Sequence, residues 1–184
     1  DFLVSDIGGY RQLRSLLTGS KGISALTHAK APPLNQDREI RADQYGIRTG
    51  LLVSGQSIKF EVVFEARMEL VMPDQGDALC NIATLIPLDF VTGKLLANSV
   101  RWRDDGVFSR DAIDLAMLAP SPKLLSQAIT KAATAYGDSI GRDLNAATHG
   151  LLTRSGWIER CMQAMDGGHA EIAGANFGHA NEVS

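Results

Sequence analysis

Several features that usually reveal what a protein does are missing from this sequence. Aromatic residues make up only 6% of the 184 residues, so the core must be mostly aliphatic. The longest apolar runs are far shorter than the roughly 18 residues that a spanning helix requires, and no signal-peptide pattern opens the chain. Asn-X-Ser/Thr acceptors for glycosylation are also absent. We therefore expect a soluble, intracellular protein without a transmembrane segment, free or within an assembled particle.

Cysteine and histidine are scarce as well. The two cysteines, Cys80 and Cys161, are too few for a disulfide framework, and we expect both to be small buried apolar side chains. None of the four histidines lies three or four residues from another or at a familiar metal-ligand spacing from a cysteine or carboxylate. These histidines are His28, His149, His169 and His179. The sequence predicts no metal site and no cofactor.

The net charge of -3 is too small to indicate binding to nucleic acid or to an anionic membrane. The charge is unevenly distributed, because residues 1–60 hold eight Lys and Arg against five Asp and Glu. We interpret this basic end first as a solvated face or an interface, and second as a phosphate-binding surface. The candidate phosphate contacts, with the arginines that flank Trp102 included, are Arg38, Arg41, Arg48, Arg101 and Arg103.

The strongest pattern that is present is an alternation of apolar and polar residues from Ile58 to Met72. This alternation predicts a β-strand about 50 Å long, which must bend and lie on a sheet that is covered on one side only. Its polar side carries Glu61, Glu65 and Glu69 in a row. Carboxylates four residues apart on a strand lie about 13 Å from each other, too far to share a proton. We expect them on a solvated face or on a surface that contacts another protein.

The remaining patterns predict an α+β fold in a single domain over residues 1–168. A helix over 6–18 and an extended segment over 20–45 precede an antiparallel, four-stranded β-meander over 46–103, whose one very long bent strand is 58–72. Helices over 109–166 follow and cover one face of the sheet. One of them runs from residue 122 to residue 149 and contains two glycines, Gly137 and Gly141, that weaken it. Residues 169–184 form a polar C-terminal arm.

One motif resembles a catalytic signature. Residues 137–141, Gly-Asp-Ser-Ile-Gly, satisfy the G-x-S-x-G pattern of a nucleophile elbow. An elbow requires a strand before the serine, whereas the residues before Ser139 have the periodicity of a helix. We therefore expect Ser139 to be an ordinary helix residue, and the sequence supplies no catalytic residue.

These observations favour a non-enzymatic, self-assembling structural subunit of coat, matrix or scaffold type, and they weigh against an enzyme. The chain would form a homo-oligomer through its sheet surface and its terminal arm, where isolated apolar residues commonly act as contact points. The expected interface residues are Glu61, Glu65, Arg67, Glu69, Ile172 and Phe177.

Two alternatives remain open. The first is a small-molecule-binding protein or enzyme with a pocket between a curved sheet and a helix. Residues that would line this pocket are Phe60, Phe64, Met68, Tyr136 and Ile140. The second is a nucleic-acid-binding module that uses the basic N-terminal third of the chain.

Overall fold

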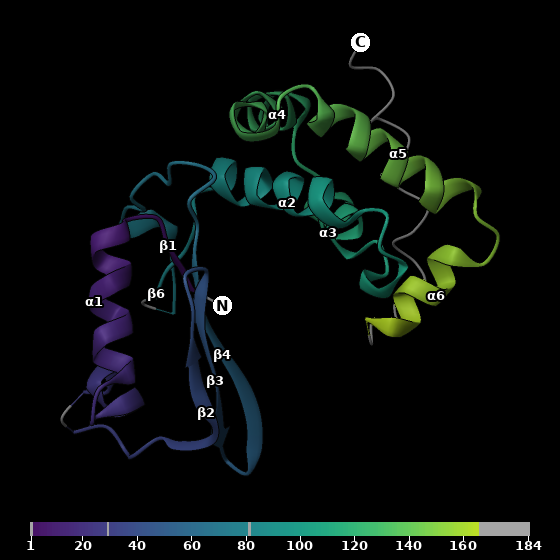
Figure 1. Ribbon diagram of the computed structural model, residues 1–184. Helices are drawn as coiled ribbons and strands as arrows, with labels where there is room; N and C mark the ends of the chain where they lie inside the picture. The colour runs from purple at the N-terminus through teal and green to yellow at the C-terminus, as the bar shows by residue number, and fades with distance from the viewer. Residues whose placement is uncertain (1, 29, 81, 166–184) are drawn as a thin grey trace. The chain divides into compact units, whose positions relative to one another are not determined.

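The computed structural model describes residues 2–28, 30–80 and 82–165 (Figure 1). Clustering of contacts divides the chain into two compact units, Asp1–Glu69 and Leu70–Ser184, and each is described by itself. The single domain expected over residues 1–168 is not tested by this division and stays a prediction. The expected C-terminal arm, with Ile172 and Phe177, lies outside the described residues.

The first unit begins with a helix that the sequence predicts well. Helix α1 spans Ile7–Thr18, and the Asp6 side chain caps it by accepting a hydrogen bond from the Gly9 N–H. Such a cap satisfies one of the N–H groups that have no partner within the first helical turn. A short 3-10 helix, η1, follows at Gly22–Leu26.

The sheet of this unit has four strands in the order β1-β4-β3-β2 (Figure 1). Their bounds are Phe2–Val4 for β1, Asn35–Ala42 for β2, Gly46–Val53 for β3 and Gln56–Phe64 for β4. Strands β2, β3 and β4 pair antiparallel, whereas β1 pairs parallel to β4. The α+β class is therefore confirmed, but the sheet is mixed rather than fully antiparallel.

The tight turn between β3 and β4 fixes the register of the sheet. Ser54 and Gly55 both have positive φ, at 50° and 80°. Two residues of this kind form the turn whose twist matches that of paired strands. The register places Leu51 opposite Ile58 and Thr49 opposite Phe60. The apolar face of the hairpin follows from this register.

The core of the first unit lies between α1 and this apolar face. Val62 is 3% exposed, and the partly buried Phe60 and Phe64 pack against the same cluster. The Tyr10 ring stacks on Phe64 with centroids 5.2 Å apart. In this unit the helix that covers the sheet is the N-terminal α1, whereas the sequence predicts cover by the helices over 109–166. The buried cluster consists of Tyr10, Leu17, Ile23, Ile47, Leu51 and Val62.

The predicted strand over 58–72 is wrong in its length, because β4 ends at Phe64. Its partner β3 begins at Gly46, which pairs with Val63, and β1 ends at Val4, which pairs with Phe64. Beyond Phe64 neither neighbouring strand offers a residue to pair with, so alternation alone cannot extend the strand. The segment expected to be extended over 20–45 contains η1 and β2, neither of which the sequence predicts. Register shifts after Gln36 and Arg38 interrupt the alternation that reveals a strand.

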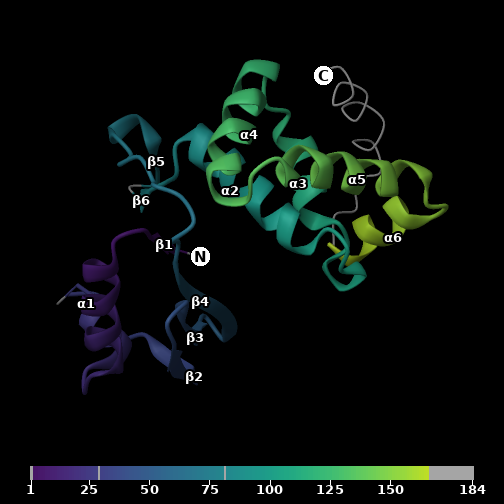
Figure 2. The same ribbon diagram turned by 45° about the horizontal axis from the view of Figure 1, so that its top comes forward.

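The second unit differs most from the predicted meander. Residues expected as two further strands form a small hairpin, β5 Ala78–Leu79 and β6 Ile82–Ala83, and then helix α2 over Pro87–Arg101 (Figure 2). Pro87, interpreted from the sequence as a bend in a strand, occupies the first position of α2, where its missing N–H costs nothing. Val91 and Leu95 are four residues apart and both buried, which is helical spacing. Cys80 is exposed at this hairpin rather than buried, whereas Cys161 is buried as expected.

Four more helices complete the described part of the second unit. They are α3 Arg110–Leu118, α4 Pro122–Tyr136, α5 Ser139–Thr153 and α6 Trp157–Ala164, with the short 3-10 helices η2 at Gln75–Asp77 and η3 at Asp105–Val107. The helix expected over 122–149 is interrupted at Gly137, whose φ of 62° lies outside the helical range. Ser139 therefore begins a helix that follows another helix, which is not the strand-to-helix context of a nucleophile elbow.

Candidate functional site

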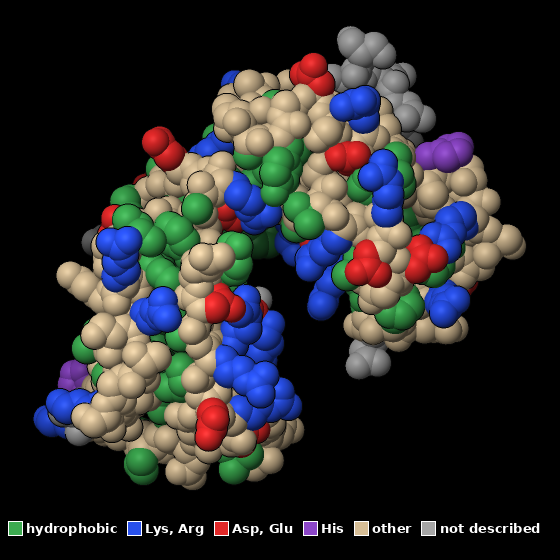
Figure 3. All heavy atoms as spheres, in the orientation of Figure 1, with side chains coloured by type: hydrophobic (Ala, Val, Ile, Leu, Met, Phe, Trp, Pro, Cys, Tyr) green, Lys and Arg blue, Asp and Glu red, His purple; other side chains and the backbone are tan. Residues whose placement is uncertain are grey.

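Charged residues gather on the face of the sheet that points away from α1. Side chains alternate between the two faces of a strand, so Arg48 lies on the opposite face from its buried neighbours Ile47 and Thr49. Figure 3 shows Lys and Arg side chains grouped over these strands. We call this surface the charged face; its residues on β2, β3 and β4 are Asp37, Arg38, Arg41, Arg48, Lys59 and Glu61.

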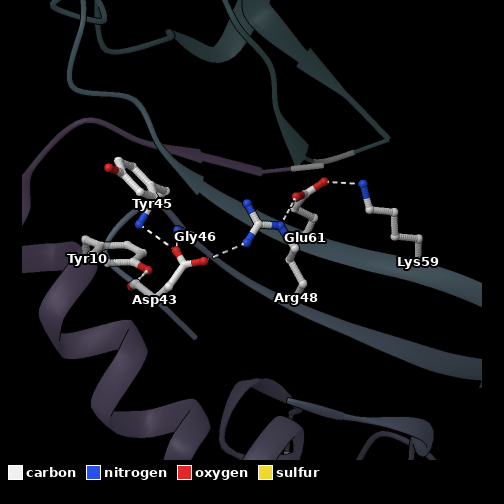
Figure 4. Close-up of polar contacts among 7 residues, drawn as sticks. All are labelled: Tyr10, Asp43, Tyr45, Gly46, Arg48, Lys59 and Glu61. Atoms are coloured by element: carbon white, nitrogen blue, oxygen red, sulfur yellow. Dashed lines mark hydrogen bonds and ion pairs between the residues drawn. The ribbon is translucent and has the colours of Figure 1, made fainter. Parts of the chain in front are cut away.

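Arg48 connects two carboxylates on this face (Figure 4). Its Nε donates to the Glu61 Oε1 at 2.7 Å, and its Nη1 donates to the Asp43 Oδ2 at 3.1 Å. Asp43 also accepts the backbone N–H groups of Tyr45 and Gly46, and its carbonyl accepts the Tyr10 hydroxyl at 2.7 Å. The hydrogen bonds that Arg48 donates to Glu61 and to Asp43 raise the pKa of its guanidinium group. Arg48 is therefore held in place and mostly neutralised.

Glu61 is nearly buried and ionised. Burial alone would raise the pKa of this carboxyl, but hydrogen bonds from Lys59 and Arg48 outweigh burial and lower it. Only 10% of the Glu61 side chain is exposed, whereas 65% of the Lys59 side chain is. The Lys59 ammonium thus binds Glu61, but the Lys59 side chain stays accessible from solvent. Lys59 can therefore also contact an anionic ligand.

Arg38 and Arg41 on β2 differ from Arg48, because no ion pair to either is found among the described residues. Both residues are exposed. Arg41 lies directly opposite Arg48 across the two strands, and like charges in that position repel each other. The expectation that Arg38, Arg41 and Arg48 contact phosphate stays a prediction.

Asp37 reaches the charged face because of a glycine on the neighbouring strand. A Cβ atom at Gly50 would lie 1.9 Å from the Asp37 Oδ1, so the carboxylate occupies the space that a side chain at Gly50 would fill. Gly50 pairs with Arg38 on β2 and with Lys59 on β4. The arrangement therefore holds an exposed carboxylate directly over the strand, among cationic side chains.

The other residues expected at an interface have local partners. Glu65 is 3% exposed, and its carboxylate accepts hydrogen bonds from the backbone N–H and the side chain of Arg67. The prediction that Glu61 and Glu65 are solvated is wrong, because adjacent cations allow both to be buried. Glu69 is exposed as expected. A role for these residues in an interface stays a prediction.

The two buried glutamates make the fold sensitive to acid. Burial raises the pKa of Glu65, but the hydrogen bonds from Arg67 outweigh it, and Glu61 behaves in the same way. Because both folded pKa values are lowered, the stabilisation is complete above the unfolded value of about 4.3 and is lost as pH falls through the folded values. We expect the urea midpoint of the wild-type protein to fall between pH 5 and pH 3 by more than the midpoint of Glu65→Gln falls. At pH 7 the midpoint of Glu65→Gln should already be lower than that of the wild type. An identical pH dependence in the two proteins would contradict this assignment.

The residues expected to line a pocket divide between the two units. Phe60 and Phe64 pack on the core of the first unit, whereas Tyr136 and Ile140 belong to the second. Met68 is 7% exposed and Ile140 is 1% exposed. A pocket formed by these residues stays a prediction.

The second unit contains buried polar pairs that the sequence did not reveal. Asp89 on α2 is fully buried and accepts hydrogen bonds from Lys131 on α4 and from the Val71 N–H. Lys94 on α2 pairs with Asp114 on α3, with both side chains about one quarter exposed. The sequence gives one sign of such pairs: the acids of α3 are three residues apart, which is the spacing of residues on the same side of a helix.

Two arginines expected as phosphate contacts also belong to this unit. Arg101 is bound through two hydrogen bonds, of 2.6 and 2.8 Å, to the nearly buried Asp111. Arg103 lies over the Trp102 ring, with its guanidinium carbon 4.4 Å from the ring centroid. Among the described residues, no group of three or more His, Cys, Asp or Glu side chains could hold a metal ion. No described helix is both long enough and apolar enough to cross a membrane.

Comparison with known proteins identifies the class to which this chain belongs. Residues 1–166 match the sequence model of a protein family described as "Nucleotidyl transferase AbiEii toxin, Type IV TA system". Because the match covers most of the chain, the protein belongs to the AbiEii family of nucleotidyl transferase toxins. No curated protein and no solved structure is similar enough to the chain to match it.

This membership corrects the function expected from the sequence. A non-enzymatic assembly subunit of coat, matrix or scaffold type is wrong, because the family consists of transferase toxins of toxin–antitoxin systems. The long alternating strand, on which the assembly interpretation depended, ends at Phe64. Lys59 and Glu61 of this segment pair with each other, as do Glu65 and Arg67.

Proposed function

We propose that this protein transfers a nucleotidyl group from a nucleoside triphosphate to an acceptor, and that it acts as the toxin of a toxin–antitoxin pair inside the cell. The observation that carries the proposal is the family match over residues 1–166. Homo-oligomer formation remains a separate expectation, which this function does not require.

The charged face carries cationic side chains of the kind that bind a triphosphate. Planar guanidinium groups bind phosphate oxygens through two parallel hydrogen bonds, and an ammonium binds them as a point charge. Arg38, Arg41 and Lys59 are exposed, and they project on the same side of three adjacent strands. Arg48 lies among them but is already occupied by Asp43 and Glu61. We assign Arg38, Arg41 and Lys59 to the phosphates and Arg48 to the support of this surface.

Asp37 is the carboxylate that we assign to the reacting end of the substrate. A magnesium ion that arrives with the triphosphate accepts carboxylate oxygens as ligands, and the exposed Asp37 places its oxygens over Gly50. No group of three or more such ligands is found among the described residues. In this proposal the chain itself binds the phosphates and places one carboxylate beside them.

Removal of the two unpaired arginines tests the role of the charged face. We expect Arg38→Ala with Arg41→Ala to raise the KM for the nucleoside triphosphate by about 10- to 100-fold, which corresponds to about 1.4–2.8 kcal/mol for the two contacts together, because charge-assisted bonds from exposed side chains contribute less than buried ones. The assay follows the transfer of α-labelled nucleotides, each of the four tested separately, to total cellular RNA. Because both residues are exposed, the urea midpoint should not change.

Arg142→Ala is the matched control, since it removes an exposed arginine from α5. An equal effect of Arg142→Ala would show that overall charge, and not the charged face, controls binding. Absence of transfer by the wild-type protein to any acceptor would refute the proposed activity itself.

A further inference from the structure

Strand β2 is interrupted at the residues that it contributes to the charged face. It lies at an edge of the sheet (Figure 1), where strands often contain an extra residue that forms a β-bulge. Its register against β3 shifts between Gln36 and Arg38 and again between Arg38 and Arg41. Each shift adds one residue of β2 that has no partner of its own on β3. Bulges of this kind re-aim side chains and are common beside functional sites.

The two shifts change the face of the sheet on which Arg38 lies. In an uninterrupted strand every second residue lies on the same face, so Arg38 would share a face with Gln36 and Ala42. Both of these residues pair with core residues of β3, so that face is the one that packs on α1. Arg38 instead pairs with Gly50, and its Cγ would lie 3.2 Å from a Cβ added at that glycine. Because the residues on either side of Gly50 are buried, such a Cβ points to the charged face.

Two side chains hold the backbone of β2 at this point. The Gln36 Nε2 and the Thr49 Oγ1 each donate a hydrogen bond of 2.6 Å to the carbonyl oxygen of Arg38. A carbonyl oxygen has two lone pairs, so it can accept both bonds. Thr49 is the residue of β3 that lies between the partners of Arg38 and Arg41, so it faces the second shift. The backbone of Arg38 is therefore held from its own strand and from the neighbouring strand.

Neither of these two side chains lies on the charged face. Thr49 is 6% exposed and lies on the core face of β3. The Gln36 Oε1 would lie 3.9 Å from a Cβ added at Gly22 of η1, a helix that contributes Ile23 to the core. Any effect of Gln36 or Thr49 on a ligand of the charged face is therefore transmitted through Arg38.

We propose that Gln36 and Thr49 are positioning residues for phosphate binding: they hold the bulged backbone of β2 so that the Arg38 guanidinium projects from the charged face. This inference rests on the proposed function, because it requires that Arg38 binds the phosphates of the substrate. It assigns a role in substrate binding to two uncharged side chains of the core face, which contact neither the substrate nor a charged group of the site.

Calorimetric titration of the full chain with inorganic triphosphate tests this role without a transfer step. We expect Arg38→Ala to weaken binding by about 3- to 10-fold, which is its share of the effect expected for Arg38 and Arg41 together. Thr49→Val removes one donor and nearly keeps the shape of the side chain, and Gln36→Met does the same for the other donor. The variant with both changes should weaken binding as much as Arg38→Ala does. Thr49→Ser retains the hydroxyl and should bind within about twofold of the wild type.

Two further measurements separate positioning from a general loss of stability. In the Arg38→Ala background, removal of both donors should cause no further loss of affinity, because the donors act through Arg38. Thr92→Val is the matched control, since Thr92 on α2 is fully buried and its hydroxyl donates to the Leu88 carbonyl at 2.7 Å. This control should lower the urea midpoint as Thr49→Val does, but leave the affinity for triphosphate unchanged.

Unchanged binding after removal of both donors would overturn the proposal, and so would an equal loss of affinity in the Arg38→Ala background. A wild-type protein that does not bind triphosphate would overturn it too, because Arg38 would then have no phosphate to bind. Failure of the proposed transfer activity is recognised separately. A wild-type protein that binds triphosphate through Arg38 but transfers no nucleotide would refute that activity and leave the positioning role of Gln36 and Thr49 in place.

Discussion

Replacement of Asp89 by alanine should lower the free energy of unfolding of the second unit by about 3–5 kcal/mol, the usual cost of breaking a buried ion pair. Asp89 has no exposed surface, and its carboxylate accepts hydrogen bonds from Lys131 and from the Val71 N–H. Its removal leaves the Lys131 ammonium without its partner, on a side chain that is only 21% exposed. It also leaves the Val71 N–H without its acceptor, which is a separate cost. Urea denaturation followed by circular dichroism measures the change.

Two further variants show which of these costs is larger. The double variant Asp89→Leu with Lys131→Met replaces both charges with apolar groups, and we expect it to recover part of the loss, because buried pairs are often no better than apolar packing. The part that is not recovered measures the hydrogen bond to Val71. Asp138→Ala, at an exposed position, should change stability by less than about 0.5 kcal/mol. A loss for Asp89→Ala as small as that for Asp138→Ala would show that the pair does not stabilise the fold.

The parts of the fold that the sequence predicts are those determined by local signals. Helix α1 follows from the Asp6 cap and its apolar spacing, and α4 begins where Ser121 caps and Pro122 starts a helix. The β3–β4 hairpin follows from alternation on both sides of a two-residue turn. In each case neighbouring residues supply both the structure and the signal that reveals it.

The errors occur where a distant segment determines the structure. Strand β4 ends at Phe64 because its neighbours end there, and one of those neighbours is β1, which is 60 residues away in the chain (Phe2 pairs with Val62). The alternation of apolar and polar residues after Phe64 gives no sign that the neighbouring strands have ended. Pro87 is compatible both with the edge of a strand and with the first turn of a helix. Only the packing of Val91 and Leu95 shows that the helix forms.

The same distinction applies to the candidate site. Composition suffices to identify Arg38, Arg41 and Arg48 as a basic group, but it does not show that Arg48 is occupied by two carboxylates while the other two are not. That difference depends on the register, which places Glu61 opposite Arg48. The position of Asp37 depends on Gly50 in another strand, and no sequence pattern predicts such a contact.

Replacement of Gly50 by alanine should therefore reduce nucleotidyl transfer by about 100-fold, the cost typical of a displacement of about 1 Å in a reacting group. The added Cβ would lie 1.9 Å from the Asp37 Oδ1 and 2.9 Å from its Cγ, so the carboxylate must leave its position over the strand. The atoms that must move furthest belong to the end of the exposed Asp37 side chain, which can turn into solvent, whereas the Arg38 Cγ, 3.2 Å from the added Cβ, must give by only a few tenths of an ångström. We thus expect the circular dichroism spectrum and the urea midpoint to change little, while the transfer rate falls.

Three comparisons make this prediction specific to the contact. Gly150→Ala makes the same chemical change in α5, where an added Cβ meets no atom within 4 Å, and it should leave activity unchanged. Asp37→Ala should lower activity to the level of Gly50→Ala. The double variant should be no worse than either single one, since both act through one carboxylate and their effects cannot add. Additive losses would mean that Gly50→Ala acts by distorting β3, and that Asp37 is not the group that the glycine positions.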